Sequence, residues 1–254
     1  MVFSSLRQDG YSYYILPNKK VKFVFQNRII PDYIEKSHDF AYKMVFGYGA
    51  QGGNNHRNYR SGGLSRRDPM TVYGDAFMGK LAEFAFYQCL NGSGHWFVSD
   101  PDVEVYPRGQ WDSGDFIIRR RYDGKSFRVS LKSTKTFGNL MLLETQDWTT
   151  DGRYIPDIGT SDGGNYDLHF MVRVGSYPEF DVRRVSNHDY AFLRRSVLSY
   201  KWCYDIPGFI TRQDLIDAIG SGLVLPQGSY LNGKIRMDAE NYYIQAGDFR
   251  KFVA

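Results

Sequence analysis

Cysteine is scarce in this sequence, and long hydrophobic runs are absent. Only Cys89 and Cys203 occur among 254 residues, too few for a disulfide framework or a thiolate zinc site. No apolar run approaches the ~20 residues that span a bilayer, which excludes a membrane-spanning helix. The first residues also lack the long apolar stretch of a signal peptide. We therefore expect a cytoplasmic protein with reduced thiols and no membrane partner.

Composition indicates a folded chain with an excess of aromatic residues. Hydrophobic residues make up 42% and charged residues 24% of the chain, which is typical of globular proteins. The net charge is only +4, but the arginines are clustered. Clustered arginine near tyrosine suits phosphate contact and base stacking, although an ordinary solvated surface is the alternative. The clusters are Arg57, Arg60, Arg66 and Arg67; Arg119, Arg120 and Arg121; and Arg183, Arg184, Arg194 and Arg195.

A glycine-rich, basic segment covers residues 47–67. Its glycines are incompatible with a regular helix, so the segment is predicted to be a long loop. It lacks the Gly-Lys-Ser/Thr ending of a phosphate-binding loop, so nucleotide binding is not indicated. The loop either contacts a nucleic acid or is a plain surface loop. The candidate nucleic-acid-binding residues are His56, Arg57, Asn58, Tyr59, Arg60, Arg66 and Arg67.

Hydrophobic periodicity and turn residues predict alternating helices and strands. Apolar spacing predicts an amphipathic helix over 75–90, and the Asp123-Gly124 turn predicts a β-hairpin over 115–132. The apolar run 166–174 is typical of a central strand. Thr211 is expected to cap a helix over 211–219. Shorter strands are expected over 21–25, 96–98, 103–106 and 241–245, and further helices from 32 onward and over 138–148.

The predicted hairpin brings together residues that suit metal-assisted chemistry. Asp115 opens one strand and Lys132 ends its partner, so both belong at the same end of an antiparallel pair. Paired carboxylates can hold Mg²⁺, and Glu83 and Glu144 are the nearby candidates for a second carboxylate. A lysine can orient a water or stabilise a phosphoryl transition state. The alternative is a simple salt bridge at the open end of a hairpin.

Two short motifs in this region resemble a known family. The run Gly114-Asp115-Phe116-Ile117-Ile118, followed by Val129-Ser130-Leu131-Lys132-Ser133-Thr134, resembles the core of the PD-(D/E)xK nuclease superfamily, which includes many type II restriction endonucleases. The preceding helix around Glu83 is similar to one that supplies an extra glutamate in several branches. The resemblance covers residues 75 to 250. It implies an α/β fold with a mixed central β-sheet flanked by helices, a restriction-endonuclease-like core over 75–254, and an N-terminal extension over 1–74.

One position departs from the family pattern. Ser130 stands where an acidic residue usually precedes the lysine by two positions. Some restriction enzymes carry this Ser-x-Lys variant and recruit a glutamate from a following helix, a role for which Glu144 is the candidate. Glu83 is the alternative second carboxylate. Asp112 competes with Asp115 as the aspartate, but Asp115 is preferred because it directly opens an apolar strand.

The resemblance implies a Mg²⁺-dependent endonuclease that hydrolyses double-stranded DNA. Within that class it favours a sequence-specific type II restriction endonuclease of a restriction-modification system. Asp115 with Glu83 or Glu144 would bind the metal, Lys132 would position the attacking water, and Ser130 would complete the catalytic motif. A homodimer is expected because many such enzymes cut both strands. The alternatives are a repair nuclease or junction resolvase of the same superfamily, a nuclease acting on RNA, and a catalytically inactive DNA-binding module.

Overall fold

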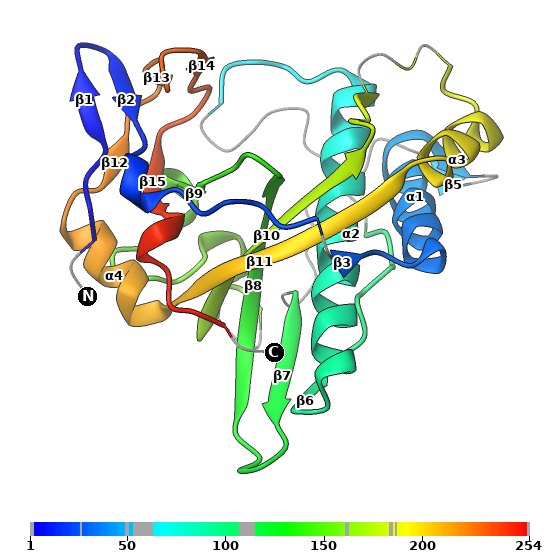
Figure 1. Cartoon of the computed structure of the whole chain (residues 1–254), viewed down its shortest axis with the longest axis horizontal. Helices are drawn as coiled ribbons and strands as arrows, with labels where there is room; N and C mark the ends of the chain where they lie inside the picture. The colour runs from blue at the N-terminus through cyan, green and yellow to red at the C-terminus, as the bar shows by residue number, and fades with distance from the viewer. Residues whose placement is uncertain are drawn as a thin grey trace.

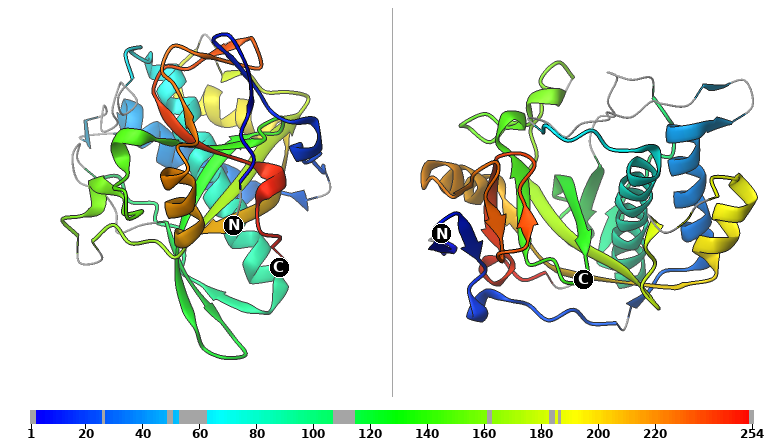
Figure 2. Two further views of the ribbon diagram at one scale, coloured as in Figure 1. Left: turned by 90° about the vertical axis from the view of Figure 1, so that its left-hand side faces the viewer. Right: turned by 90° about the horizontal axis from the view of Figure 1, so that it is seen from above.

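The chain forms three layers, and the middle layer is a mixed β-sheet, as Figures 1 and 2 show from three directions. The computed structural model describes residues 3–25, 27–48, 51–52, 63–106, 115–160, 163–182, 185 and 187–252. Within these residues there are four α-helices and several sheets, which confirms the expected α/β class. None of the helices in this part of the chain is long and apolar enough to cross a membrane.

The central sheet has six strands in the described part of the chain. Their spatial order is β3 (Asn27–Arg28), β11 (Lys201–Thr211), β10 (Leu168–Tyr177), β8 (Ser126–Lys135), β7 (Phe116–Arg120) and β6 (Trp96–Val98). Strands β6, β7 and β8 pair antiparallel, β8 and β10 pair parallel, and β10 and β11 pair antiparallel. The predicted hairpin and the predicted central strand are therefore confirmed as β7–β8 and β10.

Helix α2 (Pro69–Ser93) covers one face of this sheet. It begins at Pro69 rather than at residue 75, because the Asp68 side chain accepts hydrogen bonds from the amides of Met70 and Thr71 and so caps the helix. Its apolar side chains pack on those of β7, β8 and β10, for example with the Phe86 ring 5.4 Å from that of Phe116. Helices α1 (Pro31–Phe46) and α3 (Tyr190–Leu198) lie outside α2 (Figure 2, right).

A second, smaller sheet covers part of the opposite face. It consists of β12 (Val224–Leu225), β15 (Asn241–Gln245) and β9 (Leu140–Glu144), with helix α4 (Arg212–Gly220) beside it. Their apolar side chains form a second core with Met171 and Ile210 of the central sheet. The predicted cap of α4 is confirmed, since Thr211 and Asp214 form a reciprocal capping box.

Three predicted elements are wrong. Residues 138–148 contain β9 and a short 3₁₀ turn rather than a helix, because the consecutive apolar residues 140–143 pair with β15. Residues 21–25 form no strand; instead, their backbone carbonyls bind an arginine. Residues 103–106 form no strand either, since the Asp102 carboxylate accepts hydrogen bonds from the Glu104 amide and the Tyr106 hydroxyl.

The N-terminal residues pack against the C-terminal part of the chain. Strand β2 (Ser12–Tyr14) pairs with β1 (Arg7–Asp9) and with β13 (Tyr230–Leu231), which pairs with β14 (Ile235–Arg236). The amide side chain of Gln245 bonds to the backbone of Ser4, Ser5 and Leu16. Short strands β4 (Gly47–Tyr48) and β5 (Gln51–Gly52) pair at the start of the glycine-rich segment.

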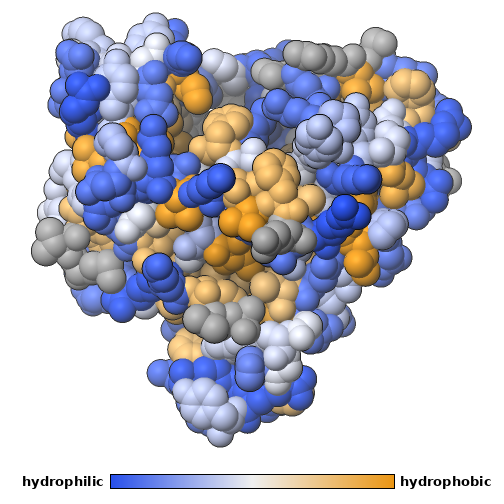
Figure 3. Space-filling view, in the orientation of Figure 1, coloured by the Kyte–Doolittle hydropathy of each residue, from blue (hydrophilic) through white to orange (hydrophobic). Residues whose placement is uncertain are grey.

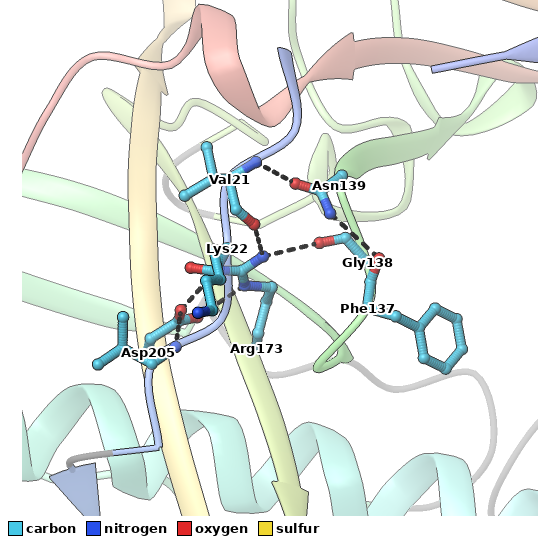
Figure 4. Close-up of polar contacts among 8 residues, drawn as sticks. Val21, Lys22, Phe137, Gly138, Asn139, Arg173 and Asp205 are labelled. Carbon is cyan, nitrogen blue, oxygen red and sulfur yellow. Dashed lines mark hydrogen bonds and ion pairs between the residues drawn. The ribbon is translucent and has the colours of Figure 1, made fainter. Parts of the chain in front are cut away.

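A buried ion pair joins these parts (Figure 4). The guanidinium of Arg173, on β10, makes a two-pronged contact with Asp205, on β11, at 2.7 and 2.5 Å. The same group donates to the backbone carbonyls of Val21, Lys22 and Gly138. Arg173 is fully buried, so these bonds compensate for the loss of water around its charge.

Replacing Asp205 with alanine is expected to lower the free energy of unfolding by about 3–5 kcal/mol, because the variant leaves the buried Arg173 charge without its partner. Asp32→Ala is the matched control: Asp32 pairs with Lys36 at 2.8 Å, but both side chains are exposed. The control should lose less than about 1 kcal/mol. Urea denaturation measures both values, and similar losses in the two variants would contradict the prediction.

Candidate functional site

The candidate site lies on the sheet face opposite α2. In β7 and β8, Phe116 and Val129 are paired and point into the core beneath α2. Side chains alternate along a strand, so the neighbouring Asp115 and Ser130 belong to the other face, together with Lys132. The parallel register sets His169 of β10 beside Ser130. The expectation that Asp115 and Lys132 share one end of the hairpin thus agrees with the register.

Asp115 lies immediately before β7, where its carboxyl group is held by the neighbouring strand. Its Oδ2 accepts a hydrogen bond from the backbone amide of Leu131 at 2.5 Å. Burial raises the pKa of Asp115, and the Leu131 amide and the positive charges of Lys132 and Lys80 act in the opposite direction. Both lysines are therefore close enough to affect this carboxyl group.

Lys132 faces an aromatic wall rather than a carboxylate. Its Nζ lies 5.4 Å from the centre of the Tyr154 ring and 5.7 Å from that of Trp148. The ammonium group makes no hydrogen bond or ion pair with any residue in the described ranges. The simple salt bridge between Asp115 and Lys132 is therefore not formed, and the lysine donors remain available to a ligand.

The wall comes from the segment between β9 and β10. The rings of Trp148 and Tyr154 lie 5.1 Å apart, and the Tyr166 hydroxyl donates to Asp157 Oδ2 at 2.6 Å. Burial raises the pKa of Tyr154, and so do the negative charges of Asp147, Asp157, Glu144 and Asp115, in that order. The negative charges of these four residues therefore all act on one phenol group.

The two candidate second carboxylates lie on different elements. Glu144 ends β9, in the layer that covers the site face, so the expectation that a following helix carries it is wrong. Its charge acts on Tyr154, as does that of Asp115. Glu83 lies on α2, on the other side of the sheet, where its Oε2 is 2.5 Å from Lys80 Nζ. Glu144 and Asp115 thus both act on Tyr154, whereas Glu83 is paired with Lys80, whose charge also acts on Asp115.

His169 is the most deeply buried ionisable group beside the site. It has no exposed surface, and neither ring nitrogen has a hydrogen-bond partner within the described part of the chain. Burial and the nearby charges of Lys132 and Arg212 lower the pKa of His169 to about 3, so the ring is neutral. The Trp148 ring lies 5.2 Å away. The sequence already offers His169, with His56 and His95, as a candidate general base, and the strand register sets it beside Ser130.

Sequence reasoning missed Tyr154, Asp157 and Tyr166. They lie in or next to the polar, glycine-rich stretch 151–164, which has no periodicity from which their direction could be predicted. Only the folded arrangement of the segment brings them to Asp115 and Lys132.

The predicted DNA-binding residues are only partly described. Arg66 is exposed, and Arg67 forms an ion pair with Asp75 of α2 at 2.8 Å. The remaining residues of that prediction, and the competing aspartate, lie outside the described residues. They are His56, Arg57, Asn58, Tyr59, Arg60 and Asp112.

A divalent cation needs several oxygen, nitrogen or sulfur ligands, and few of these are grouped in the described part of the candidate site. Among the residues that the structure describes, no three His, Cys, Asp or Glu side chains are grouped to hold a metal. Asp115 and Glu144 would supply two carboxylates. Mg²⁺ commonly takes one or two protein carboxylates and completes its shell with water and substrate phosphate, so a Mg²⁺ ion would not require a third protein ligand.

Comparisons of this chain with protein-family models, with curated proteins and with solved structures find no match. Only the residues and geometry of the site therefore indicate a function for this protein.

Asp115→Asn is expected to raise the free energy of unfolding at neutral pH in EDTA. The raised pKa means that the folded state binds the Asp115 proton more tightly than the unfolded state. The resulting stabilisation is full below the ordinary pKa of 3.8 and is lost as pH rises through the raised value. Because asparagine stays uncharged, its advantage should grow from acid to neutral pH in urea denaturation.

Asp214→Asn is the control of opposite sign. Burial alone would raise the pKa of Asp214, but hydrogen bonds from Arg250 and Thr211 outweigh it and lower the pKa to about 2. That stabilisation is present above the ordinary pKa of 3.8 and is lost as pH falls toward 2. The Asp214 variant should therefore lose stability at neutral pH. The same pH trend in both variants would refute this assignment.

Proposed function

We propose that this protein is a Mg²⁺-dependent endonuclease that hydrolyses phosphodiester bonds in DNA. The observation that carries the proposal is that Asp115 and Lys132 lie at the same end of the β7–β8 hairpin, with the Lys132 ammonium group lacking a partner in the described chain. A helix followed by an antiparallel hairpin and a parallel third strand is also in keeping with the restriction-endonuclease-like core that the sequence resemblance implies.

Asp115 and Glu144 would hold the ion. Desolvation makes the charged form of Asp115 costly, as its raised pKa shows, and a cation beside it would relieve that cost. When bound, Mg²⁺ neutralises charge on the phosphoryl group and makes a coordinated water more acidic. The Leu131 amide holds one oxygen of Asp115 and so fixes the orientation of the carboxyl group toward the site.

Lys132 would orient the attacking water and stabilise negative charge on the phosphate. The ammonium group has three N–H donors, and none of them bonds to an acceptor in the described part of the chain. The rings of Tyr154 and Trp148 support the ammonium group on one side and replace water there. Phosphate oxygens gain more from a lysine in such a desolvated place than from one in bulk water.

Ser130 bears on whether the site is active. It is buried beside Asp115 and His169, and its hydroxyl cannot supply the charge of the usual acidic residue. In the proposed enzyme, Glu144 offsets this loss from the second sheet. A DNA-binding module without catalysis is the second candidate, and Ser130 is the observation that favours it.

The proposed substrate is duplex DNA, and the proposed class is a sequence-specific type II restriction endonuclease acting as a homodimer. Arginine and asparagine in the segment 47–67 would read base edges, because their planar groups form paired hydrogen bonds with guanine and adenine. A repair nuclease or a junction resolvase would use the same site on damaged or branched DNA.

Lys132→Ala is expected to reduce DNA cleavage at least about 100-fold, because the variant loses a donor that acts in the transition state. The assay incubates the full chain with long unmethylated duplex DNA in Mg²⁺ or EDTA. Lys135→Ala, which removes an exposed lysine of the same strand, is the matched control. Discrete fragments that need Mg²⁺ and Lys132 would support a restriction endonuclease, and a smear would support a repair nuclease.

The absence of cleavage by the wild-type protein on unmethylated, methylated and branched DNA would exclude the proposed enzyme. DNA binding that persists in that case would support the inactive DNA-binding module instead. Cleavage of RNA but not of DNA would show that the substrate is RNA.

Glu144→Gln and Glu83→Gln separate the two candidate carboxylates. Glu144→Gln is expected to raise the Mg²⁺ concentration needed for half-maximal cleavage about tenfold or more, because it removes a charged oxygen ligand. Glu83→Gln should leave that concentration nearly unchanged and instead destabilise the fold, since Lys80 is buried and loses its partner. A Mg²⁺ requirement altered only by Glu83→Gln would contradict the assignment of Glu144.

A further inference from the structure

The β7–β8 hairpin carries arginines that the candidate site does not use. The hairpin and the adjoining β6 project from the body of the molecule (Figure 1), and this extension is largely hydrophilic at its surface (Figure 3). Between residues 117 and 127 there are four positive side chains and one negative side chain. The positive ones are Arg119, Arg120, Arg121 and Lys125, and the negative one is Asp123.

Two of these arginines are stacked on one exposed ring. Phe97 of β6 pairs directly with Arg119, and its side chain is 45% exposed. The guanidinium of Arg119 lies 4.7 Å and that of Arg121 lies 3.8 Å from the centre of this ring. Stacking fixes the plane of a guanidinium and leaves N–H groups at its edge for an anion.

Arg119 and Arg121 form no ion pair with any residue in the described part of the chain, whereas Arg120 pairs with Asp123 at 2.5 Å. Arg121 Nε donates to the backbone carbonyl of Trp96, which is uncharged. A pair of oriented, uncompensated guanidinium groups suits phosphate, which they can contact through two parallel hydrogen bonds.

The arginines lie on the same face of the sheet as the candidate site. Phe116 and Ile118 point into the core beneath α2, so the alternate residues Ile117 and Arg119 lie on the other face, in line with Asp115. Ile117 is 56% exposed, so the second sheet does not cover this part of the face. The exposed Ile117 and the stacked arginines therefore form an accessible strip that leads along β7 toward the buried Asp115.

We infer that this face of β6 and β7 binds the phosphate backbone of duplex DNA that flanks the cleavage site. The inference rests on the proposed function for its choice of duplex DNA. At ~3.3 Å per residue, Arg119 lies about 13 Å and Arg121 about 20 Å along the strand from Asp115. The phosphates of one DNA strand rise 3.4 Å per base pair along the helix axis, so contacts spaced along that axis fall about four and six base pairs from the cut. Three adjoining strands are too wide for the major groove, which admits two, so the contact is with the backbone.

The test measures DNA binding without metal, so that it does not depend on cleavage. The double variant Arg119→Gln/Arg121→Gln keeps planar side chains that can stack on Phe97. The control, Lys234→Gln/Arg236→Gln, removes two exposed charges near β14. Binding of a labelled duplex of about 24 base pairs is titrated in EDTA at several NaCl concentrations. The slope of log K against log salt should fall by about 1.8 in the hairpin variant, at 0.9 per lost phosphate contact, and stay unchanged in the control.

Two outcomes would overturn the inference: an unchanged slope in the hairpin variant, or an equal fall in the control. Binding and cleavage fail separately. If the wild-type chain cleaves DNA with Mg²⁺ but the hairpin variant keeps the wild-type slope, the inference fails and the nuclease remains. If the hairpin variant loses the contacts but no protein cleaves, the DNA-binding face remains and the nuclease fails.

Discussion

The buried contact between Arg173 and Asp205 is the interaction on which the arrangement of the layers depends. It joins β10 and β11 to the N-terminal segment and to the turn that precedes β9. Asn139, next in that turn, accepts a hydrogen bond from the Val21 amide at 2.6 Å (Figure 4). Because β9 starts there and ends at Glu144, the same network sets the position of a carboxylate in the candidate site.

The polar groups of this sheet face fall into two kinds. Arg173 and Asp205, and Arg250 with Asp214 at 2.6 and 2.9 Å, satisfy one another closely and are structural. Asp115, Lys132 and His169 lack such mutual compensation in the described chain. Burying these groups costs free energy, and such a cost is typical of a site that meets a ligand.

The sequence predicted much of the scaffold but little of the wall around the site. The hairpin, the central strand and the capped helix α4 follow from local signals: a turn residue pair, an apolar run and a capping threonine. The predicted helix over residues 138–148 was wrong because four consecutive apolar residues are compatible with either a buried strand or a helix. The pairing with β15 decided between them, and that partner lies far away in the sequence. The same kind of contact between distant parts of the sequence brings Trp148 and Tyr154 to Lys132.

Parallel strands need a connection that returns to the starting end of the sheet, and between β8 and β10 that connection contains β9 and short 3₁₀ turns rather than an α-helix. It folds tightly on itself: the Tyr154 amide donates to the Gly164 carbonyl, and a Cβ on Gly164 would lie 2.2 Å from the Tyr154 carbonyl oxygen. The crossover and the rim of the site are thus one piece of chain. Changes in the part of this connection that follows β9 would alter the space above Lys132 while the strand register beneath it stays the same.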